Sequence, residues 1–181
     1  MSMTDIAFPD TDAFAPGDRP SFRRILVPIS LAGDAAETLA VAARVCSSTN
    51  GVLRLLHVRI YDPPMGGYGR FYPQTLTEAA AVPERALPTI WAHGLTATAA
   101  VVHAPRGEVA SAIAQQAAAW RADVIVMTRR PTLAICRVLA RSVPDQVMRK
   151  AHCPVLVVPP RRTITQNADG YRTSADEYRR A

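Results

Sequence analysis

The stretch Ala122–Pro159, ADVIVMTRRPTLAICRVLARSVPDQVMRKAHCPVLVVP, decides the fold of this chain. It predicts a strand, a loop, a helix and a second apolar strand at Val155–Val158. In α/β proteins, ligands bind at the loop that leaves such a first strand, just outside its carboxyl end. A loop that cradles phosphate with backbone N–H groups needs glycine, because a Cβ would hold the backbone away. The loop Thr128–Ser142 contains no glycine and carries Arg129, Arg130, Arg137 and Arg141.

The chain before this stretch alternates in the same way between strand and helix. Apolar runs predict strands at Arg24–Ser30, Val52–Val58, Leu95–His103 and Ala122–Met127. Helical patterns follow them, from Asp34 as N-cap to Asn50, over Thr75–His93, over Gly107–Trp120, and from about Val143 after a short helix at Arg137–Ala140. Pro83 and Pro88 must kink or split the second of these helices. With the strand Val155–Val158, this alternation predicts an α/β fold, an open doubly wound five-stranded mostly parallel sheet with helices on both faces.

Length and composition bound the domain organisation and the location. With 181 residues, the chain is long enough for one well-buried domain. Residues 1–22 are acidic and contain proline, and residues 161–181 lack apolar periodicity. We therefore expect a flexible leader and a flexible tail around a domain at 23–160. No apolar run approaches the ~20 residues that span a bilayer, and the N-terminus lacks the pattern of a signal peptide. These features predict a cytoplasmic protein that does not enter a membrane.

The cysteines and histidines indicate neither a metal centre nor catalysis. Cys46, Cys136 and Cys153 have no metal-ligand spacing and no paired framework, so we expect reduced, structural thiols. His57 and His103 end two predicted strands and could face the ligand loop together. No nucleophile, base and orienting group can be assembled around them, and capping or core roles are the favoured interpretation. We therefore expect that the protein is not an enzyme.

Several segments resemble the universal stress protein family in their residues, their order and their spacing. They are ILVPI at Ile25–Ile29, LLHV at Leu55–Val58, ADVIVM at Ala122–Met127 and SVPDQVMRKAHCPVLVV at Ser142–Val158. The resemblance covers roughly residues 22–160. It implies the Rossmann-like, adenine nucleotide alpha hydrolase-like form of the fold, a role in the stress response, and dimerisation through the last strand.

The resembled family divides into members that bind ATP and members that do not. Binders carry an aspartate just after the first strand and, after the fourth, the pattern G-x-x-G, nine residues, G-S/T. The matching positions here are Ser30 for the aspartate and Thr128, Pro131 and Arg141 for the glycines, with Ser142 and Val143 following as in the pattern. Side chains at the glycine positions hold the backbone away from a polyphosphate, and proline also lacks an N–H donor. We therefore expect a degenerate nucleotide-binding site and no cofactor, with ATP or another nucleotide disfavoured.

Two interpretations of the arginine-rich loop stay open. Its arginines could hold a nucleotide or another small anion with side-chain forks in place of a glycine loop, or they could simply solvate the surface. Nucleic acid is disfavoured as a partner, because neither a recognised module nor interleaved aromatic residues are evident. The candidate nucleotide- or anion-binding residues are Pro28, Ser30, Val58, Thr128, Arg129, Arg130, Pro131, Arg141, Ser142 and Val143.

The last strand and one long loop are the candidate contact regions. Val155, Leu156, Val157 and Val158 form an apolar strand at the end of an open sheet, where the same strand of a second copy would cover the free backbone edge. Val155 and Val157 would share one face of the joined sheet, and Leu156 and Val158 the other. The loop Tyr61–Tyr72 could act as a lid or docking loop, although a tolerated surface insertion is the favoured interpretation.

These patterns together predict a non-enzymatic stress-response or regulatory interaction module. We expect it to be a homodimer that contacts a protein partner and does not bind ATP in the usual way. The alternative function is the binding of a nucleotide or another small anionic ligand beyond the first and fourth strands.

Overall fold

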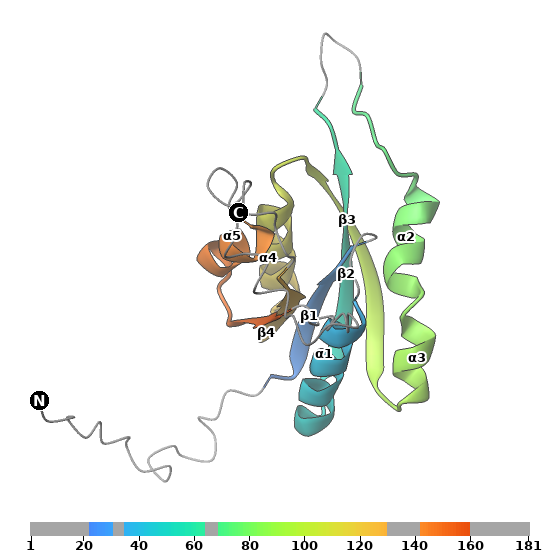
Figure 1. Ribbon diagram of the computed structural model, residues 1–181, viewed down its shortest axis with the longest axis vertical. Coiled ribbons are helices and arrows are strands. Elements are labelled where there is room, and N and C mark those ends of the chain that lie inside the picture. Colours follow the sequence, from blue (N-terminus) through green and yellow to red (C-terminus); the bar gives the residue numbers. More distant parts are fainter. Residues whose placement is uncertain (1–21, 31–34, 64–68, 130–141, 160–181) are drawn as a thin grey trace, which may run out of the picture.

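The computed structural model describes residues 22–30, 35–63, 69–129 and 142–159. Within them, strands and helices alternate along the chain, as Figure 1 shows. The elements are β1 (Arg24–Ile29), α1 (Ala36–Thr49), β2 (Val52–Tyr61), α2 (Leu76–Glu84), α3 (Leu87–Ala92), β3 (Thr96–Pro105), α4 (Val109–Trp120), β4 (Val124–Thr128), α5 (Val143–Lys150) and β5 (Val155–Val158).

The described strands form a sheet in the order β3-β2-β1-β4-β5, and each pairing between neighbours is parallel. From β1 the chain proceeds outward to β3 in one direction, whereas β4 and β5 lie in the other. The strand order therefore reverses between β1 and β4, which are paired at Ile25–Val124 and Leu26–Ile125. This topology confirms the predicted doubly wound fold. In such sheets, the point of reversal is where ligands bind.

Helices cover both faces of the sheet, and each face has its own core. Ile25 and Val27 of β1 pack with buried residues of α1 and α3, whereas Leu26 packs with buried residues of α4 and α5. In Figure 1, α4 and α5 lie to the left of the sheet, and α2 and α3 lie to the right. A strand that is buried on both faces needs apolar residues without alternation, which explains the continuous apolar runs of the sequence.

Two strands continue beyond their predicted ends. The prediction ended β2 at Val58 and β3 at His103, but the paired strands extend to Tyr61 and Pro105. Those predicted ends were wrong because backbone pairing does not depend on side-chain polarity: the ladder continues past Val58 through Arg59 and past His103 through Ala104 and Pro105. In this extension Arg59 lies beside His103.

The ends of α1 follow from local backbone geometry. Its N-cap is Ala35, which makes no side-chain cap, rather than the predicted Asp34, which lies outside the described residues. The helix ends at Asn50, whose φ of 51° is left-handed. The next residue is Gly51, where an added Cβ would lie 2.7 Å from the carbonyl oxygen of Arg23. Glycine is therefore required where this turn passes β1.

Prolines divide the predicted helix Thr75–His93 into two helices, as expected. Pro83 lies in the last turn of α2, and Pro88 lies in the first turn of α3, where a missing N–H costs no helical hydrogen bond. Thr75 and Glu78 form a capping box that fixes the start of α2. The described helices include none long and apolar enough to cross a bilayer.

The helix α5 begins at Val143, as predicted, with Ser142 as its N-cap and Pro144 in its first turn. The predicted short helix Arg137–Ala140 lies outside the described residues. The start of α5 and the end of β4 thus both lie beside the reversal point of the sheet.

Candidate functional site

The candidate site is the carboxyl edge of β1 and β4, where several predicted ligand residues lie. Ser30 follows β1 and is exposed, Thr128 ends β4, and Arg129 comes directly after it. The backbone N–H of Arg129 donates to the carbonyl oxygen of Val158 on β5 (3.1 Å), so the first residue of the loop is still held by the sheet. Arg130, Pro131 and Arg141 lie outside the described residues.

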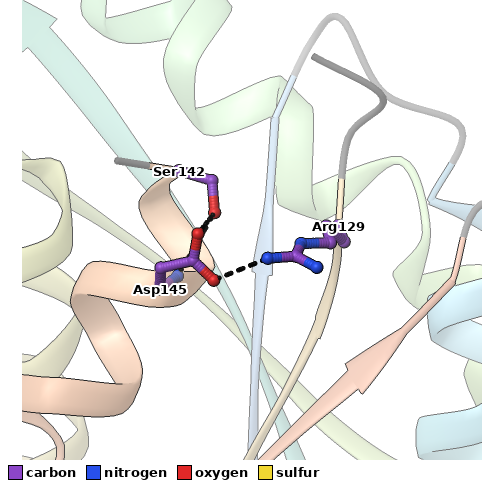
Figure 2. Close-up of polar contacts among 3 residues, drawn as sticks. All are labelled: Arg129, Ser142 and Asp145. Atoms are coloured by element: carbon purple, nitrogen blue, oxygen red, sulfur yellow. Dashed lines mark hydrogen bonds and ion pairs between the residues drawn. The ribbon is translucent and has the colours of Figure 1, made fainter. Parts of the chain in front are cut away.

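A carboxylate joins two of the predicted anion ligands at this edge. Asp145, in the first turn of α5, accepts a hydrogen bond from the hydroxyl of Ser142 (Oγ to Oδ2, 2.6 Å). Its other oxygen, Oδ1, accepts from Nη2 of Arg129 at 2.8 Å. Figure 2 shows Arg129 reaching from the end of β4 to the first turn of α5. We name this group the Arg129–Ser142–Asp145 triangle.

The triangle keeps a negative charge at the start of α5. The hydrogen bond from Ser142 lowers the pKa of Asp145, and the positive charge of Arg129 lowers it further. The backbone N–H of Asp145 also donates to the hydroxyl of Ser142 (3.4 Å), which caps the helix. A helix N-terminus attracts negative charge, and here the chain's own carboxylate lies there. The partial positive charge at the start of α5, which would attract an incoming anion, is therefore already compensated by Asp145.

Sequence reasoning missed Asp145, although a signal for it was present. Ser142 and Asp145 have the spacing S-x-x-D, which is typical of a capped helix start. The spacing predicts the contact within α5. It does not predict the contact to Arg129, which lies on another element and depends on the sheet.

Thr128, at the first predicted glycine position, uses its side chain for packing. Its hydroxyl is hydrogen-bonded to the hydroxyl of Thr38 on α1. Thr38 is only 2% exposed, so the pair lies between α1 and the end of β4. The side chain at this position therefore attaches α1 to the sheet, which a glycine could not do.

Two buried side-chain atoms have no hydrogen-bond partner within the described residues. They are Oε2 of Glu37, in the first turn of α1, and Nε2 of Gln74, both buried. Gln74 lies against His57, whose Nε2 is 3.0 Å from its Oε1, and Nδ1 of His57 is 3.0 Å from the carbonyl oxygen of Ile29. Gln74 thus lies beside the end of β1, and α1 follows that strand in the chain.

The two histidines differ in their surroundings. His57 is 5% exposed and links β1 to Gln74, so it has the predicted core role. His103 is exposed and lies edge-on to the ring of Tyr72, with ring centroids 5.6 Å apart. Within the described residues, no group of three His, Cys, Asp or Glu side chains could hold a metal ion.

The ends of the loop Tyr61–Tyr72 are anchored to the sheet. Asp62 and Phe71 form an antiparallel bridge, and Arg106 makes an ion pair with Asp62 (2.6 Å). The guanidinium of Arg59 lies 3.9 Å from the centre of the Tyr72 ring. Residues 64–68 lie outside the described part of the chain.

The other predicted site residues lie at their expected places in the strands and in α5. Pro28 lies in β1 beside Leu56, and Val58, in β2, is 9% exposed and belongs to the core under α4 and α5. Val143 begins α5 and is 36% exposed.

Of the two described thiols, that of Cys46 is buried and that of Cys153 is partly buried. The thiol of Cys46 donates to the carbonyl oxygen of Gly51 (3.1 Å), and burial raises its pKa. Burial likewise raises the pKa of Cys153. Cys136 lies outside the described residues.

The predicted contact strand β5 lies at the edge of the described sheet, paired with β4. Val155 packs with the core under α4 and α5, and Val158 packs with the core under α1 and α3. Leu156 is 41% exposed, although its neighbour Val158 is only 5% exposed. An apolar side chain thus lies exposed on a strand at the edge of the described sheet.

Comparison with protein-family profiles matches residues 21–159 to the Universal stress protein family. No curated protein matches the chain significantly in sequence. A solved universal stress protein from Archaeoglobus fulgidus is 23% identical over 75% of this chain and 93% of its own, with a TM-score of 0.58. A structure from the same organism in complex with dAMP is 22% identical, with a TM-score of 0.56 over 76% and 98% of the two chains. An Arabidopsis thaliana family protein with AMP bound is 14% identical, with a TM-score of 0.54 over 76% and 92%. These structures share the fold.

Proposed function

Because the chain belongs to the universal stress protein family, we propose that it is a non-enzymatic, cytoplasmic regulatory module of the stress response that does not bind ATP in the usual way. The observation that carries this proposal is the Arg129–Ser142–Asp145 triangle. Its carboxylate engages a serine and an arginine that could otherwise hold a phosphate.

Electrostatics explain why the triangle opposes a polyphosphate. A phosphate that approaches the start of α5 meets the negative charge of Asp145, and it can bind Ser142 and Arg129 only by displacing that charge. Because its lowered pKa keeps Asp145 ionised at neutral pH, the repulsion persists under cellular conditions. The Thr128 side chain adds a steric reason, since it occupies a position where backbone N–H groups would need close access.

Isothermal titration of the protein with ATP, AMP and cyclic AMP tests the proposal. We expect no binding of ATP at concentrations up to the millimolar range. A low-micromolar dissociation constant for ATP would contradict the proposal.

The second candidate function is the binding of a ligand with a single phosphate, which two observations favour. Arg129 is 57% exposed despite its ion pair, so part of its guanidinium remains accessible. Among the described residues, the buried acceptor Oε2 of Glu37 and the buried donor Nε2 of Gln74 have no hydrogen-bond partner. A nucleobase presents both a donor and an acceptor on one edge, and two of the solved structures contain dAMP or AMP.

A thermal-shift screen of nucleoside monophosphates tests this alternative. A stabilising compound should lose its effect in both Arg129→Gln and Glu37→Gln. The first variant removes the cation, and the second replaces the carboxylate whose Oε2 has no partner within the described residues. Arg85→Gln, an exposed arginine at the end of α2, is the matched control. Stabilisation that survives both site variants would show that the compound binds elsewhere.

We also propose that the protein is a homodimer paired through β5. The exposed Leu156 and the edge position of the strand support this assignment. Pairing two such edges would join the sheets of two copies and bury Leu156 at the contact.

A further inference from the structure

A cluster of arginines surrounds Trp120 at the amino-terminal end of the sheet. The guanidinium carbons of Arg24 and Arg54 lie 5.4 Å and 4.6 Å from the centre of the indole ring. Arg24 is the first residue of β1, Arg54 lies in β2, and Trp120 is the last residue of α4. This Trp120 cluster is thus at the opposite end of β1 from Ser30, and so away from the candidate site.

The strand register explains why both arginines face the same ring. Arg54 is paired with Leu26, whose side chain packs against α4 and α5, so Arg54 lies on the α4 face. Arg24 precedes Leu26 by two residues and faces the same side. Both guanidinium groups therefore lie beyond the apolar core, at the last residue of α4.

The cluster brings two like charges together, at Arg24 and Arg54. Burial lowers the pKa of Arg54, and the positive charge of Arg24 lowers it further. Within the described residues, neither arginine takes part in an ion pair. Asp123 lies at the same end, but its Oδ2 accepts hydrogen bonds from the backbone N–H groups of Arg23 and Arg24 (2.9 and 2.7 Å). The two side chains thus repel one another, and the contacts to Trp120 hold them in place.

The arrangement is also preorganised. Nε of Arg54 lies 3.5 Å from Oγ1 of Thr98 on β3, so the guanidinium is held between this hydroxyl and the indole. Arginine presents planar forks of N–H donors that match the oxygens of a phosphate, and an arginine held in place loses little freedom when it binds. Arg121, next to Trp120 and exposed, adds further positive charge.

We propose that the Trp120 cluster is a binding site for a phosphate monoester, held between the guanidinium groups of Arg24 and Arg54. A phosphate monoester carries a charge near −2 at neutral pH. It would neutralise both arginines and relieve their repulsion, whereas a single carboxylate would leave one positive charge. The site is independent of the carboxyl edge of β1 and β4.

The indole signals of the protein provide a specific test, because the chain has two tryptophans. Titration with inorganic phosphate in a phosphate-free buffer should shift the indole N–H resonance of Trp120 saturably. Trp91 is the internal control, since its Nε1 donates to the carbonyl oxygen of Ala97 on the other face of the sheet (3.2 Å). In Arg54→Gln and Arg24→Gln, the affinity should fall at least tenfold, whereas Arg85→Gln should leave it unchanged.

A phosphoserine peptide and its unphosphorylated form extend the test to the source of the phosphate. Equal affinities for inorganic phosphate and the phosphopeptide would identify a small phosphorylated compound as the ligand class. Tighter binding of the phosphopeptide would identify a phosphorylated protein segment. The proposal is overturned if the Trp120 resonance does not move with either probe, or if its shift persists unchanged in both arginine variants.

Discussion

Asp145 accepts a 2.6 Å hydrogen bond from Ser142 and turns its second oxygen to Arg129, which is 16 residues earlier in the chain. The contact connects the start of α5 with the end of β4, the two elements that border the reversal point of the sheet. A negative charge from the protein itself therefore lies where this fold would otherwise present positive groups to a ligand.

Removing the charge of Asp145 should create anion binding. In Asp145→Asn, Arg129 loses its ion pair and the start of α5 loses its negative charge. We expect a measurable affinity for pyrophosphate by isothermal titration, at least tenfold above that of the unmodified protein. Asp62→Asn makes the same charge change in the ion pair with Arg106 and should have no such effect. Equal affinities in the two variants would show that only net charge matters.

The same carboxylate should contribute to stability in a defined range of pH. Because its pKa is lowered in the folded protein, Asp145 stabilises the fold above the ordinary pKa of an aspartate. That contribution falls as the pH decreases through the lowered pKa. Urea denaturation should therefore show Asp145→Asn to be less stable than the unmodified protein at pH 7, with the gap closing toward pH 2. A difference in stability between the two proteins that stays constant from pH 7 to pH 2 would show that the ionisation of Asp145 does not contribute to stability.

Glycine at position 51 should be required by the close approach of β1. In Gly51→Ala, the new Cβ would meet the backbone of Arg23 at 2.7 Å, and a backbone atom cannot move away cheaply. We expect a loss of about 1–3 kcal/mol in the free energy of unfolding. Gly69→Ala should change it little, because no described atom beyond the chain neighbours lies within 4 Å of the added Cβ. Similar losses in the two variants would contradict this explanation.

The hydroxyl pair of Thr38 and Thr128 should behave as a coupled unit. Thr38→Val removes one partner and leaves a part-buried hydroxyl alone, which costs about 1–2 kcal/mol. The double variant with Thr128→Val should lose less than the two single losses added together, because no hydroxyl is then left unpaired. Denaturant unfolding of the four proteins measures the coupling, and strict additivity would show that the two hydroxyls do not interact.

A charge on β5 should separate the proposed dimer. Leu156→Lys places a lysine on each of the two strands that would pair, so the contact loses apolar area and gains repulsion. Light scattering should report the mass of a dimer for the unmodified protein and of a monomer for the variant. Leu76→Lys, which changes an exposed leucine on α2, should remain dimeric. A dimer that persists in Leu156→Lys would place the contact elsewhere.

Local patterns predicted the fold well because both faces of the parallel sheet are buried. The run Ile25–Val27 is buried on both faces and is therefore apolar throughout, which predicts a strand. The helix that follows Ser142 could likewise be predicted from a local pattern. The polar continuation of β2 past Val58, which begins at Arg59, was missed because backbone pairing there does not depend on apolar side chains.

The site was less predictable because its contacts join distant segments. The departures from a glycine loop could be predicted, and so could the capped start of α5. The partner of Thr128 is 90 residues away in the sequence, and no local pattern indicates it. Likewise, the Trp120 cluster takes its side chains from two strands and a helix, so only the sheet register brings them together.

Native mass spectrometry of the protein purified from its own host tests the central claim most directly, because it reports ligand content and assembly in one spectrum. If Asp145 blocks phosphate binding at the carboxyl edge of β1 and β4, the protein should carry no ATP, even after incubation with millimolar ATP. If β5 pairs with the same strand of a second copy, the spectrum should show a dimer. A spectrum in which each protomer carries one ATP would contradict it.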